Sequence, residues 1–333
     1  MIHERPKIIV ITPVRNEAWV LEAFLTHCSS WADRIIIADQ HSTDGSREIA
    51  AAFPKVTLID NPHEEWIENE VRTLLIEEAW RTEGEKIIFA LDADEFLSKG
   101  FSESDGWHRL LESEPNEVFC LRWFNLYGDF CHGEVNGGAE WVGRFCSDLN
   151  LGEEYHRIEH HAVHCMRVPC LEEERCRYTD IEDIRFVHLG GLDRRRTRNK
   201  LDFYQVVNHD KNPNKTSAVA LYREYTRQCH YEAPSLPEPV VIEDANGNDL
   251  TPLVCTSDYG QHYIDEMMAI FKREGCRKFA ALCIWDNPDL RAAGIEYTPP
   301  LAIRLMHSYL RHSQKCSNTP LVRFVDKILK RLF

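Results

Sequence analysis

KIIFALDADE, residues 86–95, carries an apolar run straight into a group of acidic residues, and this transition decides the fold. The apolar part has the length and composition of a strand covered on both faces of a sheet. Similar runs occur earlier at residues 7–12 (KIIVIT), 34–38 (RIIIA) and 56–59. Segments with helical periodicity separate these runs. Such alternation predicts an α/β fold with a mostly parallel sheet flanked by helices.

The segments between the strands have the features of amphipathic helices. One predicted helix begins near Asn16, and another spans residues 65–83 and ends at Gly84, where a helix-ending glycine belongs. Residues 13–17, 39–44 and 92–95 all follow strands directly. Because ligands in parallel sheets bind beyond the carboxyl ends of the strands, we expect these three loops to meet at one edge. The first helix is expected to bury one apolar stripe, formed by Val20, Leu21, Phe24, Leu25 and Cys28.

The pattern loosens after about residue 98. Two further strands are predicted, and the rest of the chain is mainly helical. We therefore expect an α/β domain over residues 1–210, with halves of about 1–98 and 99–210, and a mainly helical extension over residues 211–333. The predicted strands are 118–124 and 141–145, and the predicted helices are 194–207, 216–228, 259–274, 300–312 and 321–333.

Composition limits the function classes. The 333 residues are 43% hydrophobic and 28% charged, which is typical of a globular protein. A net charge of −15 disfavours nucleic acid as the main partner, since such binding depends on neutralising phosphates. No apolar run is long enough to span a bilayer, and the N-terminus lacks a signal-peptide pattern. The 12 cysteines include no CxxC pair, so reduced thiols and a cytoplasmic location are expected.

Asp92 and Asp94 are the first candidates for chemistry. Two carboxylates two residues apart, after a buried strand, offer the oxygen ligands that Mg²⁺ and Mn²⁺ prefer. The alternative is a solvated acidic turn. Asp39 ends the second predicted strand, where a carboxylate can accept a hydrogen bond from a base or a ribose; the alternative is a turn residue.

Four segments together resemble successive motifs of glycosyltransferase family 2, in family order and spacing. They are residues 11–17 (ITPVRNE), 38–46 (ADQHSTDGS), 69–72 (NEVR) and 91–95 (LDADE). The resemblance covers residues 7–98 strongly and 118–205 loosely. It implies a GT-A fold, a nucleotide-diphosphate sugar donor, a Mn²⁺ or Mg²⁺ cofactor, and transfer with inversion at the anomeric carbon.

The resemblance also implies roles for individual residues. Arg15 stands where the family often has tyrosine, and Gln40-His41 replaces the usual Asp-Gly. These departures leave the donor open among UDP-, GDP- and dTDP-sugars. By motif, Pro13, Arg15 and Glu17 of the first loop and Asp39 would bind the donor, with Asp39 bonded to the nucleotide base. Arg72 would lie near the ribose or diphosphate, and Asp92 on the ribose side. Asp94 would bind the metal.

Inverting transfer needs a general base to take the acceptor's proton. By the resemblance, Glu159 is the candidate, with Glu154 as the second choice; the alternative for each is a surface ion pair. His188 is the candidate for a further metal ligand, and its alternative is a hydrogen-bonded histidine at a strand end. His156, His160 and His164 have the spacing of one helical face, but they match no closed zinc pattern.

Two basic segments also have competing interpretations. The run RRRTRNK at residues 194–200 suits phosphate binding or a solvated helix face. The C-terminal segment 321–333 alternates apolar and basic residues, which fits a peripheral membrane helix or a helix packed on the protein.

The resulting hypothesis is an inverting, metal-assisted glycosyltransferase acting on a glycan, lipid-linked or protein acceptor. A non-catalytic nucleotide-sugar-binding protein is one alternative. A sugar nucleotidyltransferase is another, but it needs a glycine-rich loop after the first strand, and residues 13–19 contain no glycine.

Overall fold

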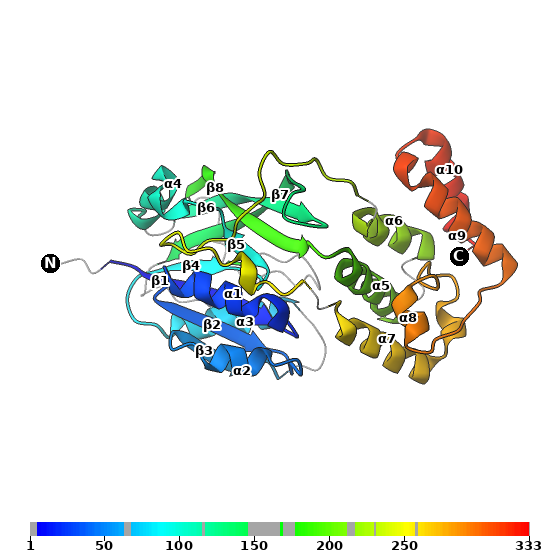
Figure 1. Ribbon diagram of the computed structural model, residues 1–333, viewed down its shortest axis with the longest axis horizontal. Coiled ribbons are helices and arrows are strands. Elements are labelled where there is room, and N and C mark those ends of the chain that lie inside the picture. The colour runs from blue at the N-terminus through cyan, green and yellow to red at the C-terminus, as the bar shows by residue number, and fades with distance from the viewer. Residues whose placement is uncertain are drawn as a thin grey trace. The chain divides into compact units, whose positions relative to one another are not determined.

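The computed structural model divides into two compact units (Figure 1). One consists of Met1–Leu126, Phe130–Gly190 and Pro234–Cys255, and the other of Tyr127–Asp129, Gly191–Ala233 and Thr256–Phe333. We call them the α/β unit and the helical unit. The residues whose structure is described are 5–62, 68–114, 117–145, 167–168, 177–211, 217–229, 231–256 and 259–332.

An eight-stranded sheet, in the order β3-β2-β1-β4-β7-β6-β8-β5, forms the centre of the α/β unit. The first four strands in this order are parallel: β3 (Val56–Asp60), β2 (Arg34–Asp39), β1 (Lys7–Val14) and β4 (Lys86–Ala90). Antiparallel pairing joins β4 to β7, β7 to β6, and β8 to β5. The added strands are β7 (Gly133–Phe145), β6 (Glu117–Tyr127), β8 (Arg177–Gly191) and β5 (Glu95–Leu97).

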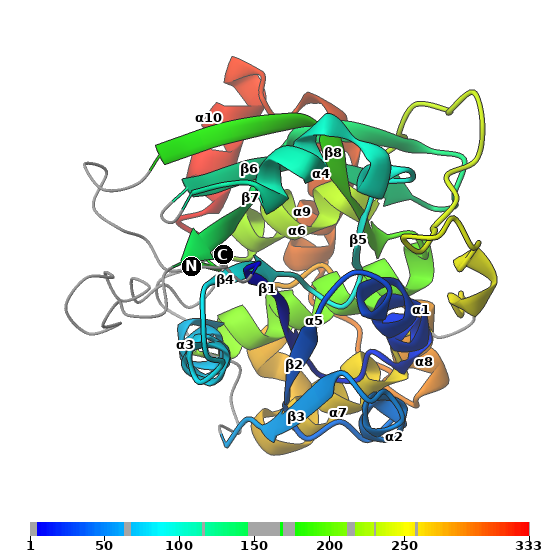
Figure 2. The same ribbon diagram turned by 90° about the vertical axis from the view of Figure 1, so that its left-hand side faces the viewer.

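Helices cover both faces of the parallel strands. Figure 2 shows α3 (Glu68–Trp80) on one side of β1–β3, and α1 (Ala18–Ser29) with α2 (Ser46–Ala51) on the other. Alternate strand residues, including Ile9, Ile11 and Ile36, pack with Val71 and Leu75 of α3. Successive side chains of a strand point to opposite faces, so the residues between them face α1 and α2. The expected α1 stripe is confirmed: Val20, Leu21, Phe24, Leu25 and Cys28 are fully buried.

The helical unit has its own apolar core. Helix α5 (Arg194–Lys211) contributes Val206 to a cluster with Leu221 of α6 (Ala218–Cys229) and Met267 of α7 (Gln261–Glu274). Because α5 packs on α6 and α7, the contact boundary lies at residue 191, not at the expected residue 210. Among the described residues, no helix has the length and apolar character needed to cross a membrane. The remaining helices are α8 (Pro288–Ala292), α9 (Leu301–Ser313) and α10 (Pro320–Leu329).

The α/β class, the helix-flanked parallel strands and the mainly helical C-terminal region are therefore confirmed. Three elements of the α/β unit were not predicted: the strands β5 and β8, and the helix α4 (Asp105–Leu111). The side-chain oxygen of Ser104 accepts a hydrogen bond from Trp107 N and caps α4.

A buried histidine ties three parts of the α/β unit together. His27 in α1 is fully buried, and its Nδ1 lies 2.6 Å from the Glu243 carbonyl oxygen, to which it donates. Its Nε2 accepts from Leu97 N in β5 at 3.2 Å. Burial lowers the pKa of His27 to about 4, although the Glu243 bond and the charge of Asp244 act in the opposite direction. The neutral ring is therefore the form that the fold requires.

We expect this histidine to make the fold acid-sensitive. The unfolded chain binds a proton near pH 6.5 and the folded chain only near pH 4, so stability is lost as the pH falls through this range. The loss is about 3 kcal/mol from 2.5 pKa units. Urea unfolding at pH 7.5 and pH 4 measures it. His27→Gln is expected to remove most of this loss, whereas exposed His108→Gln is expected to retain it; equal pH slopes in both variants would contradict the assignment.

Candidate functional site

The loops after β1 and β2 are joined by hydrogen bonds, as their common position at the strand ends predicts. Asn16 N donates to Ser42 Oγ at 2.9 Å, and Thr43 N donates to Asn16 Oδ1 at 2.8 Å. Asp44 Oδ2 accepts from Ala18 N at 2.9 Å, so the second loop caps the helix that follows the first. Asn16 and His41 have φ values of 57° and 54°, in the left-handed region. The two loops form one locally constrained surface.

Asp39 lies at the end of β2, beside Val14 of β1. It is 1% exposed, and its Oδ2 accepts from Arg47 Nη1 at 2.7 Å and from Ser42 N at 3.2 Å. Its Oδ1 is buried, and within the described part of the chain it has no hydrogen-bond partner. An unpaired buried acceptor is costly, so a donor from a ligand that reaches Oδ1 gains the full value of the bond.

Asp92 is held between two arginines. Arg72 Nη2 in α3 donates to its Oδ1 at 2.6 Å, and Arg167 Nη2 donates to its Oδ2 at 2.8 Å. Burial raises the pKa of Asp92, but the charges of Arg167 and Arg72 outweigh it, and the net pKa lies below the ordinary value. Asp92 is therefore ionised at neutral pH, and its side chain remains 37% exposed.

Glu95 has a different role from the two aspartates before it. Its side chain is 1% exposed, and its Oε2 accepts from Asp92 N at 2.9 Å and from Arg167 Nη1 at 2.7 Å. Burial raises the pKa of Glu95, and the Arg167 charge only partly offsets this. Glu95 thus shapes the turn and holds Arg167, whereas Asp92 and Asp94 remain at the strand-end edge.

Asp94 and His188 come together across 94 positions of sequence. β5 pairs with β8 so that Glu95 lies opposite His188, and Leu189 N donates to the Asp94 carbonyl at 2.9 Å. His188 Nε2 lies 3.6 Å from Asp94 Oδ2. Its Nδ1 donates to Asn125 Oδ1 at 2.7 Å, and the ring stacks on Trp123 at 5.7 Å between centroids. His188 Nε2 therefore faces the Asp94 carboxylate.

This pair suits a divalent cation. A carboxylate oxygen and an imidazole nitrogen face one another, and the second ring nitrogen is fixed by an amide, as is usual for metal-bound histidine. The described residues contain no group of three or more His, Cys, Asp or Glu side chains arranged to hold a metal. Mg²⁺ and Mn²⁺ commonly take few protein ligands and complete their shell with water and substrate phosphates. The donor set therefore fits a cation bound together with a phosphate ligand.

Gly190 keeps the pair accessible. A Cβ at this position would lie 2.6 Å from His188 Nε2 and 3.2 Å from Asp94 Oδ2. At the first distance the His188 ring would have to shift, so glycine leaves the space beside the histidine open.

The other predicted residues are partly placed. Pro13 is buried in β1, and Arg15 and Glu17 are half-buried in the loop that follows. Glu17 Oε2 accepts from Trp19 Nε1 at 2.5 Å. Glu159, Glu154 and the three histidines considered for zinc lie outside the described residues. Arg167, Asn125 and Trp123 were not predicted, because no local pattern links them to the motif residues.

Comparisons with known proteins give two distant structural likenesses. No curated protein is significantly similar in sequence to the chain. The chain is similar to a solved 4-diphosphocytidyl-2C-methyl-D-erythritol synthase, with 13% identity over 54% of this chain and 89% of that one, and a TM-score of 0.33. It is also similar to a mannose-1-phosphate geranyltransferase from Thermus thermophilus, with 13% identity over 44% of this chain and 51% of that one, and a TM-score of 0.27. At these scores neither likeness bears on activity.

The family comparison is more specific. The model described as Glycosyl transferase family 2 matches residues 9–104, less than a third of the chain. This range contains Asp39, Arg72, Asp92 and Asp94, whereas His188 lies beyond it. The match indicates a transferase of the nucleotide-sugar type. Residues 9–104 of the chain are therefore similar to glycosyl transferase family 2.

Proposed function

We propose that the protein transfers a sugar from a nucleoside-diphosphate donor to an acceptor hydroxyl, with inversion at the anomeric carbon. The observation that carries this proposal is the pairing of Asp94 with His188 beside the arginine-held Asp92, at the carboxyl end of β4. Two carboxylates with different partners therefore lie together. Asp92 is neutralised by arginines, and Asp94 faces the imidazole of His188.

The described residues divide the work of binding the donor. Asp39 Oδ1 accepts a base N–H once the side chains that cover it move aside. Asp92, oriented by Arg72 and Arg167, accepts ribose hydroxyls, because an ionised carboxylate makes strong hydrogen bonds. Asp94 and His188 would hold a Mn²⁺ or Mg²⁺ ion, which would supply positive charge to the diphosphate of the donor. Glu159 remains the proposed base that takes the acceptor's proton.

Nucleotide titration tests the donor site. We expect one of UDP, GDP and dTDP to bind, more tightly with Mn²⁺, as measured by calorimetry. Asp39→Asn is expected to weaken binding about tenfold, since a hydrogen bond to a charged group is worth about 1.5–3 kcal/mol. Asp94→Ala is expected to remove the Mn²⁺ dependence and to leave the metal-free affinity unchanged.

Asp60→Asn is the matched control for Asp39. Asp60 binds the same arginine, with Arg47 Nη1 at 2.8 Å, but its side chain is 75% exposed. The control is expected to bind nucleotide as the wild type does. If no nucleotide binds to the folded wild type, or if Asp39→Asn and Asp60→Asn have the same nucleotide affinity, the proposed donor site is wrong.

A further inference from the structure

Helix α10 of the helical unit has three distinct faces. Val322 and Asp326 face inward and are 8% and 7% exposed. A second face is apolar but exposed: Leu321, Phe324 and Ile328, at spacings of three and four residues, are 73%, 62% and 45% exposed. We call these three residues the apolar stripe. Leu332, 68% exposed, continues it beyond the helix.

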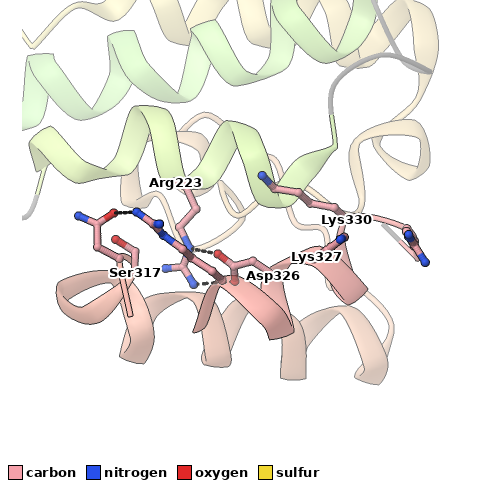
Figure 3. Close-up of a pocket in the computed structure, with 8 residues that line it drawn as sticks. Arg223, Ser317, Asp326, Lys327 and Lys330 are labelled. Atoms are coloured by element: carbon pink, nitrogen blue, oxygen red, sulfur yellow. Dashed lines mark hydrogen bonds and ion pairs between the residues drawn. The ribbon is translucent and has the colours of Figure 1, made fainter. Parts of the chain in front are cut away.

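The third face of α10 is basic. Arg323, Lys327 and Lys330 recur at spacings of four and three residues and are exposed. With Arg331 and Arg223 they line a pocket of about 590 Å³ that also contains Ser317, Asn318 and Asp326. Figure 3 shows Arg223 reaching from α6 to Asp326 on α10, with Lys327 and Lys330 further along the same helix.

Arg223 fixes the position of the helix beside this pocket. Its Nε donates to Asp326 Oδ2 at 2.9 Å, its Nη2 to Ser313 Oγ at 2.6 Å, and its Nη1 to the Leu310 carbonyl at 3.0 Å. Tyr309 of α9 also donates to Asp326 Oδ1 at 3.0 Å. The acidic residue of the pocket is thereby neutralised within the protein. Because these bonds fix α10, its basic side chains and the apolar stripe keep fixed positions on neighbouring faces of the helix.

The C-terminal part of the chain, which contains α9 and α10, has a net charge opposite in sign to that of the whole chain. Residues 297–333 contain seven Lys or Arg residues and one Asp, a net charge of +6, whereas the whole chain carries −15. A surface formed by two copies of this face would bring like charges together. Exposed apolar side chains beside basic ones match an interface that offers hydrocarbon next to anionic headgroups.

We propose that α10 lies on an anionic lipid surface, with the apolar stripe inserted among the acyl chains and the basic pocket over the phosphate headgroups. The helix lies along the interface without crossing it. This attachment is independent of nucleotide binding, so it is tested without donor or metal.

Vesicle co-sedimentation of the full chain measures the attachment. We compare vesicles of phosphatidylcholine alone with vesicles that also contain phosphatidylglycerol. Binding is expected only to the anionic vesicles. It is expected to fall when ionic strength rises from about 0.1 M to 1 M, which shortens the screening length about threefold.

Two sets of variants separate the apolar and basic contributions. Replacing Leu321, Phe324 and Ile328 by Ser is expected to weaken binding at least about tenfold, because partial burial of such side chains contributes strongly. Replacing Arg323, Lys327 and Lys330 by Gln is expected to weaken it about 100-fold, at about fivefold for each charge near an anionic surface. Val135→Ser with Leu253→Ser is the control pair, since both residues are exposed in the α/β unit.

The outcomes distinguish a lipid surface from a second copy of the chain. Failure of the wild type to bind anionic vesicles overturns the proposal. So does unchanged binding in the apolar-stripe variant with a native circular dichroism spectrum. A wild-type dimer in sedimentation equilibrium that Phe324→Ser converts to a monomer, without vesicle binding, would assign the face to self-association instead.

Discussion

Asp94→Asn is expected to lower kcat for sugar transfer by about 10³-fold, because a bound cation contributes several kcal/mol of charge stabilisation at the transition state. Asparagine has nearly the same shape, so the 8%-exposed site remains packed. The substitution removes the charge from one of the two side chains that we assign to the cation. The effect is measured as donor consumption with and without Mn²⁺.

Asn125→Leu extends this test to the positioning of His188. Asn125 bonds to Nδ1 of His188, the ring nitrogen that does not face Asp94, so it is a positioning residue. Its loss is expected to cost about 10–100-fold in metal affinity, as removal of such outer hydrogen bonds does. A higher Mn²⁺ concentration is expected to restore activity in this variant but not in Asp94→Asn.

Asp105→Asn is the matched control for Asp94, since Asp105 is an exposed carboxylate in the same unit. It is expected to keep wild-type activity and Mn²⁺ dependence. Full activity of Asp94→Asn, or a Mn²⁺ response that survives in it, would show that the pair with His188 does not serve the reaction.

The sequence predicts the parallel strands well because each is a short, β-branched run that is buried on both faces. The predicted bounds of β1, β2, β3 and β4 differ from the observed ones by at most two residues. Strand β5 is only three residues long, too short to show any periodicity. Without it, the antiparallel pairing that brings Asp94 to His188 is invisible in the sequence, although each residue was a candidate on other grounds.

Ion pairs between distant residues were the main omission. The run at 194–200 was interpreted as a phosphate site or a solvated face. In the structure Arg195 binds Asp289 at 2.5 Å and Arg198 binds Asp286 at 2.7 Å. These contacts span about 90 residues, and no local spacing encodes them. The same reason hid Arg167, which lies 75 residues from the aspartate that it binds.

Arg167→Leu is expected to destabilise the α/β unit by about 3–5 kcal/mol, the usual cost of breaking a buried ion pair from one side. Arg167 and Glu95 have side-chain exposures of 9% and 1%, so water cannot replace the missing guanidinium. Asp92 keeps Arg72, whereas Glu95 loses its cationic partner. The unpaired carboxylate of Glu95 is therefore expected to account for most of the lost stability.

The pH dependence identifies that carboxylate. Burial already raises the pKa of Glu95 above its ordinary value of 4.5, and removal of the Arg167 charge raises it further. The folded state then binds a proton more tightly than the unfolded state, so stability falls as the pH rises above 4.5 toward the folded-state pKa. Urea unfolding at pH 5 and pH 8 is expected to show a larger deficit at pH 8.

Glu95→Gln in the Arg167→Leu background completes the cycle. A neutral amide needs no cation, and it can still accept from Asp92 N, so we expect about half of the lost stability to return and the added pH dependence to disappear. Arg81→Leu is the control, because its pair with Glu78 leaves Arg81 75% exposed and is worth at most about 1 kcal/mol. If the second substitution adds to the loss instead, Arg167 stabilises the fold through its position over Trp123, and not through Glu95.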